Sequence, residues 1–168
     1  MNIKKILLVA LIAVAIVVSV SAVSAGLFDG LMGGEQQDKI IEIDDITFNT
    51  TNVTKFNTYN ESEEAGVRAT WYMDENQTGY NVHIINANGL DDDTYYQLID
   101  IYKDDYNNQP SEVIDGVVIY TMSANSGPYV GQPRYVAYVV NNDLKTIVDF
   151  GSPDANETAK MASTLKFK

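Results

Sequence analysis

Two pairs of short alternating segments constrain the fold of this chain more than any other feature of its sequence. Apolar and polar residues alternate in residues 67–73 and again in 80–85, and a second such pair covers 134–140 and 144–150. Alternation with a period of two is typical of half-buried β-strands. Because only a few polar residues separate the two segments of each pair, each pair is predicted to form an antiparallel hairpin.

Shorter runs of β-branched and aromatic residues extend this pattern. Residues 40–43, 46–48 and 117–122 are predicted to be strands on the same grounds. The segment 49–64 is polar and rich in Asn and Thr, so it is predicted to be a loop or an exposed sheet edge. Strands therefore dominate the predicted fold.

Two helices are predicted, one in the middle of the chain and one at its end. The acidic run Asp91–Asp93 suits the positive end of a helix dipole, and large apolar residues recur at helical spacing from Tyr95 to Tyr106. The second helix is predicted to begin near Ser152–Asp154, where Glu157 occupies the capping-box position. Strands packed by a central and a C-terminal helix predict an α+β fold with an antiparallel β-sheet.

The apolar stripes of these helices predict the core. Trp71 and Leu98 are expected to be buried between the sheet and the central helix. The C-terminal helix is expected to face the sheet through Thr158, Met161, Ala162 and Leu165, and Phe167 is expected to close that end of the core.

The first 25 residues carry an export pattern, in which Lys4 and Lys5 precede an uncharged stretch over 6–25 that ends in small residues. A basic start, an apolar centre and a small-residue site are typical of a signal peptide, although about 20 apolar residues also suffice to span a bilayer. Residues 1–25 are therefore predicted to be a cleaved signal peptide or an N-terminal hydrophobic membrane-anchor helix. A flexible linker over 26–38 and a globular domain over 39–168 follow, outside the cytoplasm, either secreted or anchored to the cell membrane.

The chain carries a net charge of −12 and contains no cysteine. An acidic surface repels phosphate backbones, so no nucleic-acid partner is expected. The absence of cysteine excludes disulfides, thiol catalysis and cysteine-ligated metals. The sequence contains no phosphate-binding loop and no nucleophile motif, and no cofactor is predicted.

Five Asn-x-Ser/Thr motifs make the chain a candidate glycoprotein, because N-linked sugar is attached at such motifs in exported proteins. Three of the five crowd into the polar segment 49–64, which is otherwise interpreted as a plain hydrophilic loop. The candidate acceptors are Asn49, Asn52, Asn60, Asn76 and Asn156.

Residues 74–79 resemble the beginning of a calcium-binding loop. Asp74, Asn76 and Thr78 offer oxygen side chains at alternate positions ahead of Gly79, but the twelfth position, which should be a bidentate Glu, is Ile85. The same residue types are favoured in turns. The three residues are therefore weak metal candidates, and the segment is predicted to be a hairpin turn.

Histidine and tyrosine are the remaining residue types with chemical potential. His83 is the only histidine, which argues against a histidine-ligated zinc site, and it is predicted to be solvated or at a sheet edge. The eleven tyrosines are predicted to be mainly core and cross-strand residues. Exposed tyrosines would suit a carbohydrate or peptide ligand.

The order of elements after Tyr80 resembles that of PsbP-like domains. The pattern is a strand, an Asn-Asn-Asp turn, a strand, Ser-Pro, a helix and the closing run Ser163–Phe167. This resemblance covers residues 80–167 and implies an antiparallel sheet flanked by helices, in a family with many small exported members that have no known catalysis. The whole chain is also similar to small exported or membrane-anchored proteins of unknown function from methanogenic archaea. Neither resemblance implies particular site residues.

An export segment without a catalytic constellation favours a non-enzymatic extracytoplasmic domain. Such a domain is expected to bind a protein or carbohydrate ligand in the cell envelope, and to contact the membrane through residues 1–25 if that segment is not cleaved. The alternative is an extracytoplasmic hydrolase with a carboxylate-based site, which requires two Asp or Glu side chains that converge in a cleft. Adjacent pairs such as Asp44–Asp45 do not provide this by themselves, because neighbouring side chains point in different directions.

Overall fold

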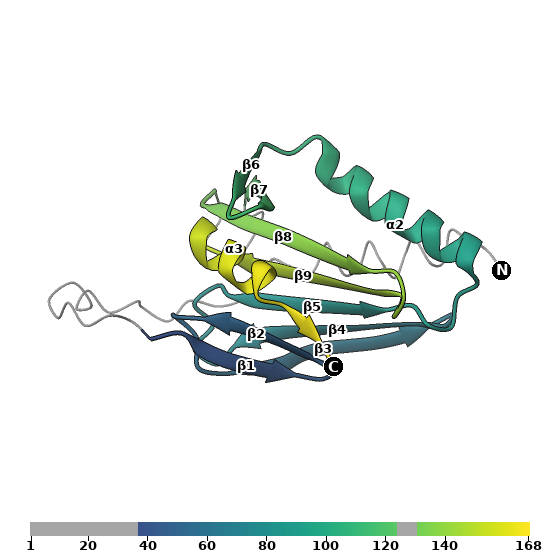
Figure 1. The fold of residues 1–168 in the computed structure, drawn as a ribbon, viewed down its shortest axis with the longest axis horizontal. Coiled ribbons are helices and arrows are strands. Elements are labelled where there is room, and N and C mark those ends of the chain that lie inside the picture. Colours follow the sequence, from purple (N-terminus) through teal and green to yellow (C-terminus); the bar gives the residue numbers. More distant parts are fainter. Residues whose placement is uncertain (1–36, 124–130) are drawn as a thin grey trace, which may run out of the picture.

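The computed structural model describes residues 37–123 and 131–168. Within these residues, two antiparallel sheets and two helices form an α+β fold (Figure 1). The predicted N-terminal export or anchor helix lies outside the described residues, as does nearly all of the predicted linker. Among the described residues, no helix is long and apolar enough to cross a membrane.

The larger sheet contains seven strands, and each neighbouring pair is antiparallel. The two predicted hairpins are present, and they lie side by side because the second strand of the first hairpin pairs with the second strand of the other. From one edge to the other, the strands are β3 (Phe56–Glu64), β4 (Val67–Asp74), β5 (Asn81–Asn86), β9 (Thr146–Ser152), β8 (Pro133–Asn141), β7 (Val117–Ser123) and β6 (Ser111–Ile114).

A smaller sheet of three strands is the feature that the sequence did not predict. It consists of β1 (Lys39–Ile43), β2 (Ile46–Thr50) and the two-residue β10 (Lys166–Phe167), with β2 in the centre. After β2 the chain crosses to the edge of the larger sheet, where β3 is the exposed edge predicted within residues 49–64.

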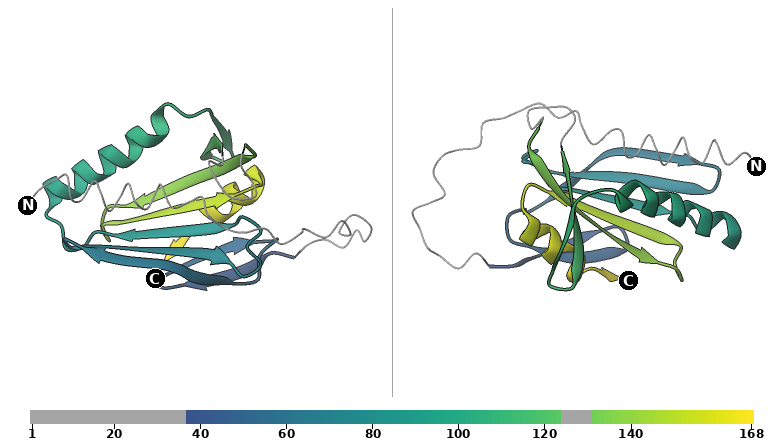
Figure 2. Two further views of the ribbon diagram at one scale, coloured as in Figure 1. Left: turned by 180° about the vertical axis from the view of Figure 1, so that it is seen from behind. Right: turned by 90° about the horizontal axis from the view of Figure 1, so that it is seen from above.

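The two helices cover opposite faces of the larger sheet (Figures 1 and 2). Helix α2 (Asp92–Asn107) packs on one face, and α3 (Ala155–Ser163) packs on the other together with the smaller sheet. Strand β5 illustrates the division, because Val82 and Ile84 join the α3 face whereas Ile85 joins the α2 face. The larger sheet is therefore the middle layer of the fold.

Both helix starts follow their sequence signals, with one difference in detail. Asp91 caps α2 and accepts a hydrogen bond from the Thr94 N–H at 2.9 Å, and Asp154 caps α3. Glu157 does not complete the expected capping box. Its carboxylate instead accepts hydrogen bonds from the chain after β2, because the smaller sheet brings three better-placed donors there.

Most of the predicted core residues are buried, and Leu165 and Phe167 are partly buried. Leu98 is 2% exposed and lies in the cluster beneath α2, and Trp71 is 7% exposed and stacks on His83 with ring centroids 4.8 Å apart. On the opposite face, Met161 is fully buried and Phe167 packs against the core from the end of the chain. The C-terminal helix is thus an integral layer of the fold.

Candidate functional site

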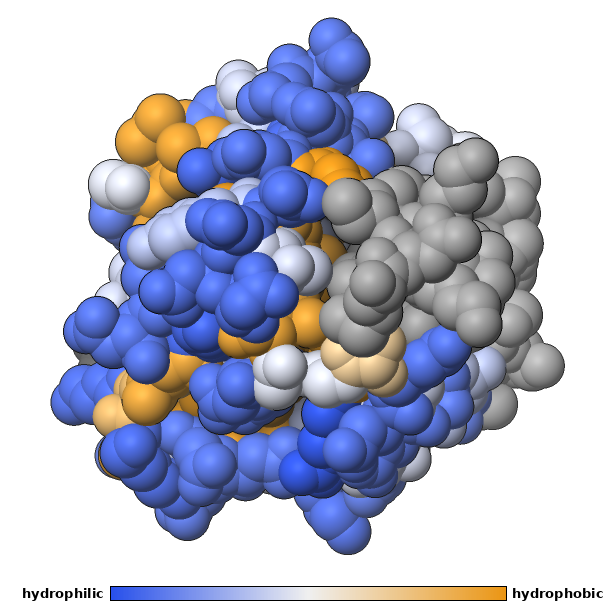
Figure 3. All heavy atoms as spheres, turned by 90° about the vertical axis from the view of Figure 1, so that its right-hand side faces the viewer, coloured by the Kyte–Doolittle hydropathy of each residue, from blue (hydrophilic) through white to orange (hydrophobic). Residues whose placement is uncertain are grey.

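A cleft of about 330 Å³ lies where the smaller sheet meets the larger one. Its lining includes the C-terminal residues Phe167 and Lys168. Figure 3 shows the molecule from the right-hand side of Figure 1, and this side is largely hydrophilic with hydrophobic residues visible in between. Five separate parts of the chain line the cleft: the β1–β2 turn, β4, the β5 end and its following loop, the beginning of β9, and the C-terminal residues.

The floor of the cleft is formed by three neighbouring strands of the larger sheet. Thr70 on β4 is directly opposite Ile84 on β5, and Asn86 on β5 is directly opposite Thr146 on β9. Residues directly opposite each other in an antiparallel pair point to the same face, so these four side chains share one surface. Hydroxyl, amide and aliphatic groups are therefore combined in a small area.

The β1–β2 turn forms one wall of the cleft. Asp44 adopts a left-handed backbone conformation with φ of 47°, which closes this tight turn and places Asp44 and Asp45 at the rim. The Asp45 carbonyl accepts a hydrogen bond from the Lys168 N–H at 2.9 Å, which ties the C-terminus to the same wall.

Three of the four charged side chains that line the cleft have partners among the described residues. The Arg68 guanidinium is 2.7 Å from the Glu61 carboxylate, and the Lys168 ammonium pairs with Glu42. The Tyr72 hydroxyl donates to Asp44 Oδ2 at 2.6 Å, and burial followed by this hydrogen bond raises the pKa of Tyr72. Among the neutral groups of the floor, the Thr146 hydroxyl donates to the Leu144 carbonyl at 2.9 Å, and Asn86 Oδ1 accepts from the Asn88 N–H at 3.1 Å. The Asn86 side-chain N–H groups and the Thr70 hydroxyl are therefore left to contact a ligand within the described residues.

The alternative, a carboxylate-based hydrolytic site, requires two Asp or Glu side chains that converge in a cleft. The two carboxylates that line the cleft belong to the sequence neighbours Asp44 and Asp45, and one of them is bonded to Tyr72. Within the described residues, no group of three or more His, Asp and Glu side chains is placed to hold a metal ion.

A second polar group lies on the opposite face of the larger sheet, beneath α2. Both Tyr102 and Tyr106 donate their hydroxyls to Asp149 Oδ2, at 2.5 and 2.9 Å. Burial raises the pKa of Asp149 to about 6, although the two tyrosine hydrogen bonds oppose this shift. Tyr120 and Tyr138 pack against Tyr106, so the cluster is closed by aromatic rings and serves the core.

His83 occupies a position that the sequence did not predict. It was expected to be solvated or at an edge, but it is 2% exposed because β5 is an interior strand of the larger sheet. It lies directly opposite Trp71 on one side and Asp149 on the other. Burial lowers the pKa of His83 to about 4, so the neutral imidazole serves as a stacking partner for Trp71.

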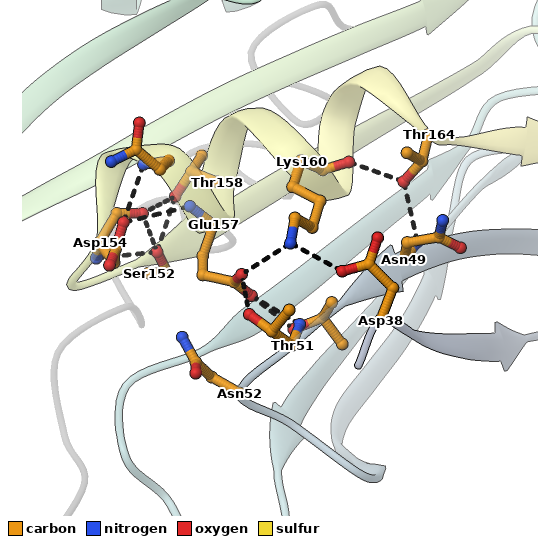
Figure 4. Close-up of polar contacts among 12 residues, drawn as sticks. Asp38, Asn49, Thr51, Asn52, Ser152, Asp154, Glu157, Thr158, Lys160 and Thr164 are labelled. Carbon is orange, nitrogen blue, oxygen red and sulfur yellow. Dashed lines mark hydrogen bonds and ion pairs between the residues drawn. The ribbon is translucent and has the colours of Figure 1, made fainter. Parts of the chain in front are cut away.

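Glu157 is the centre of a third polar group, which fixes α3 to the smaller sheet (Figure 4). Its carboxylate accepts hydrogen bonds from the Thr50 hydroxyl at 2.8 Å, from the Thr51 N–H at 3.0 Å, and from the Thr51 hydroxyl. Lys160 lies 3.6 Å from it and also binds Asp38 at 2.8 Å. Burial favours a raised pKa for Glu157, but the threonine hydrogen bonds and the Lys160 charge outweigh burial and lower it.

The weak calcium candidates form a hydrogen-bonded turn. Asp74 is buried, and its carboxylate accepts hydrogen bonds from the Thr78 N–H at 2.8 Å, the Thr78 hydroxyl at 2.9 Å and the Tyr80 N–H at 3.0 Å. Asn76 and Thr78 are exposed. The hairpin turn predicted over 74–79 is therefore present and uses the Asp74 oxygens for its own backbone.

The five candidate glycosylation sites differ strongly in their surroundings. Asn52, Asn60, Asn76 and Asn156 are exposed, whereas Asn49 is half-buried on β2. The side-chain amide of Asn52 donates to the Tyr80 hydroxyl at 3.0 Å. The Asn-x-Ser/Thr motif does not predict these differences, because the same motif is present at all five positions.

The cleft residues carry no local sequence signal, because they come from five separate segments. The pair Asp44–Asp45 was noted only as adjacent carboxylates, and nothing in the sequence connected it with Thr70, Asn86 or Thr146. Phe167 is the one aromatic residue that lines the cleft.

No family model and no curated protein matches this chain. The resemblance of residues 80–167 to PsbP-like domains therefore stays a prediction.

Proposed function

We propose that this chain is an exported, non-enzymatic domain that binds a small uncharged polar ligand in the cleft between its two sheets. The cleft carries the proposal. Its volume of about 330 Å³ falls within the usual range of small-molecule sites, about 300–1,000 Å³. Its lining combines apolar side chains with polar groups fixed on strands, and a few precisely placed polar groups are typical of such sites.

The chemistry of the lining favours an uncharged ligand. The Thr70 hydroxyl and the Asn86 side-chain N–H groups supply neutral donors, and the Thr146 hydroxyl, which donates to the Leu144 carbonyl, can still accept. Ile84 and Phe167 supply apolar surface. Arg68 and Lys168 pair with Glu61 and Glu42, and Asp44 and Asp45 also line the cleft, so a ligand anion would meet carboxylates as well as cations there. A molecule with hydroxyls on one side and C–H groups on the other, such as a single sugar unit, matches this arrangement.

Export is supported by the N-terminal sequence. Lys4 and Lys5 before the uncharged stretch 6–25 favour translocation of the following domain, with the lysines left on the cytoplasmic side. If the small-residue site is used, the protein is secreted with Gly26 as its first residue. If it is not used, residues 1–25 hold the domain at the membrane.

Ligand-observed NMR with the full chain in detergent tests the binding proposal. The probes are a panel of neutral monosaccharides and, for comparison, a panel of free amino acids. Saturation transfer is expected to a neutral sugar and to be lost in Asn86→Ala. The matched control Asn57→Ala removes an exposed asparagine from β3, outside the cleft, and should bind like the parent chain. Binding of amino acids alone, or equal loss in both variants, would contradict the proposal.

A further inference from the structure

Attachment of an N-linked sugar makes geometric demands that the Asn-x-Ser/Thr motif alone does not reveal. The transferase must hold both the Asn amide and the Ser or Thr hydroxyl of the motif, so both groups must be free to leave the protein surface. In a folded chain, a hydroxyl buried in the core meets this demand only when the structure opens locally.

In two of the five motifs, the threonine hydroxyl is buried and therefore not accessible to the transferase. In the motif of Asn49 the Thr51 hydroxyl is buried and donates to Glu157. In the motif of Asn156 the Thr158 hydroxyl is fully buried, where it contacts Ser152 Oγ at 2.8 Å and lies 3.1 Å from the Tyr135 carbonyl oxygen. To present either hydroxyl to the transferase, hydrogen bonds that join α3 to a neighbouring sheet would have to break.

Two further motifs are engaged in turns. The amide nitrogen of Asn52 is itself a donor to Tyr80, so the atom that would carry the sugar is already in use. In the motif of Asn76, the Thr78 hydroxyl and N–H both donate to the buried Asp74 carboxylate. Presenting that motif to an enzyme would break the bonds that hold the β4–β5 turn.

In the motif of Asn60, both the asparagine and the serine side chain are exposed. Asn60, Glu61 and Ser62 are all exposed, and no hydrogen bond to the side chain of Asn60 or Ser62 is present among the described residues. The Glu61 carboxylate pairs with Arg68, but both side chains are about half exposed, and such surface pairs contribute little. Strand β3 is already extended, and within the described residues it pairs only with β4.

We propose that Asn60 is the position at which this chain receives an N-linked glycan. In the reaction, Asn60 Nδ2 forms a bond to the anomeric carbon of a saccharide carried on a lipid-linked phosphate donor. The bond between that carbon and the phosphate oxygen breaks, the phosphate leaves with the electron pair, and the amide gives up one proton. The inference rests on the proposed export of the chain, because the donor and its transferase act outside the cytoplasm.

A glycan at this position also suits the architecture. Strand β3 is nine residues long and forms one edge of the larger sheet, where eight of its residues are exposed. Exposed sheet edges invite pairing with other chains, and bulky or charged groups oppose it. The three glutamates of β3 and a sugar on Asn60 would act together to block such pairing.

An in vitro transfer assay tests the inference independently of export. The full chain, folded in detergent, is incubated with a membrane extract that contains an N-x-S/T oligosaccharyltransferase and its lipid-linked donor. Five synthetic peptides that cover the separate motifs are treated in parallel. Mass spectrometry then gives, for each asparagine, the ratio of modification in the folded chain to that in its peptide.

The ratio is expected to be at least about tenfold higher at Asn60 than at Asn49 or Asn156, because the latter motifs react only through local opening. Ser62→Ala should abolish the product on the folded chain, whereas the matched Thr78→Ala should leave the Asn60 product in place. An Asn60 peptide that is modified while folded Asn60 is not would overturn the inference. So would preferential modification of Asn49, Asn52 or Asn156 in the folded chain.

Expression in a glycosylating host separates this inference from the proposed export. A sugar on Asn60 of the membrane or secreted fraction supports both. A chain that remains in the cytoplasm, together with transfer to Asn60 in vitro, refutes export but retains the acceptor site. An exported chain that is not modified at Asn60 refutes the acceptor site alone.

Discussion

Each face of the larger sheet holds a carboxylate that is bonded to hydroxyl groups, yet the pKa of one is lowered and that of the other is raised. Under α3, Glu157 has three donors from Thr50 and Thr51 and an ammonium group nearby. Under α2, Asp149 has two tyrosine donors, both on the same oxygen. At Asp149 two hydroxyls do not offset the cost of desolvation, whereas at Glu157 three donors and a cation do.

The same two faces also differ in how they are packed. Helix α3 approaches its neighbours through small residues, since Ala159 and Ala162 are buried against the sheets. Helix α2 is held against the sheet by rings, with Tyr102 and Tyr106 packed on Tyr138. One face is therefore joined through close backbone contact and the other through a layer of tyrosines.

Removing the α3 face altogether should have the largest effect. Deletion of residues 153–168 takes away α3 and β10 and uncovers the fully buried Phe48, Val148 and Phe150. Exposed apolar patches of this kind drive association, so the shortened chain is expected to aggregate. Size-exclusion chromatography and thermal unfolding are the measurements. A monomeric product with the melting temperature of the full chain would mean that α3 is only an appendage.

Truncating the α2 face at one residue should have the next largest effect. Leu98 is 2% exposed in the cluster beneath α2, so Leu98→Ala is expected to reduce the free energy of unfolding by roughly 2–5 kcal/mol. The control Gln97→Ala changes an exposed residue of the same helix and should stay within about 0.5 kcal/mol. Chemical denaturation measures both. Equal effects would show that α2 does not bury this stripe.

The sequence could predict the elements that depend on local patterns, but it could not predict the smaller sheet. The hairpins, both helix starts and the inner stripe of α2 follow from local periodicity and capping, which depend on neighbouring residues. The smaller sheet depends on Phe167 meeting Ile46 across most of the chain, which no local pattern contains.

The surroundings of the polar residues could not be predicted from the sequence for the same reason. His83 has the surroundings of an interior residue because β9 pairs with β5, and Glu157 meets Thr50 and Thr51 because β2 lies beside α3. The cleft likewise joins five separate segments. In each case the partner residues lie too far apart in the sequence for periodicity to connect them.

The contributions of His83 and of the directly opposite residue Asp149 to the free energy of unfolding should depend on pH in opposite ways. The raised pKa of Asp149 gives a contribution that is present below about pH 4 and is lost as the pH rises to about 6. The lowered pKa of His83 gives a contribution that is present above about pH 6.5 and is lost as the pH falls to about 4. Each is worth about 3 kcal/mol, and between pH 4 and 6 they oppose each other.

Single substitutions should therefore reveal opposite slopes. Relative to the parent chain, Asp149→Asn is expected to gain stability as the pH rises from 4 to 7, and His83→Gln to lose it over the same range. Urea denaturation at closely spaced pH values measures both differences. Parallel curves for the two variants and the parent would show that neither residue is buried as described.

The smallest effect is expected at Glu157, and it has the opposite sign to that at Asp149. The lowered pKa of Glu157 means that its contribution is present above the pKa of an unfolded glutamate, near 4.5, and is lost as the pH falls below it.

Glu157→Gln keeps the size of the side chain but replaces one acceptor oxygen by a donor, which leaves a threonine donor of the α3 face without an acceptor. The expected loss is about 1–3 kcal/mol at pH 7, the range for a buried group without its hydrogen bond, and it should shrink towards pH 3. Glu112→Gln, on the exposed strand β6, is the matched control and should change stability by less than about 0.5 kcal/mol at either pH. A loss that is the same at pH 7 and pH 3 would mean that shape, and not charge, is what the threonines recognise in Glu157, and the contrast between the two carboxylates would then disappear.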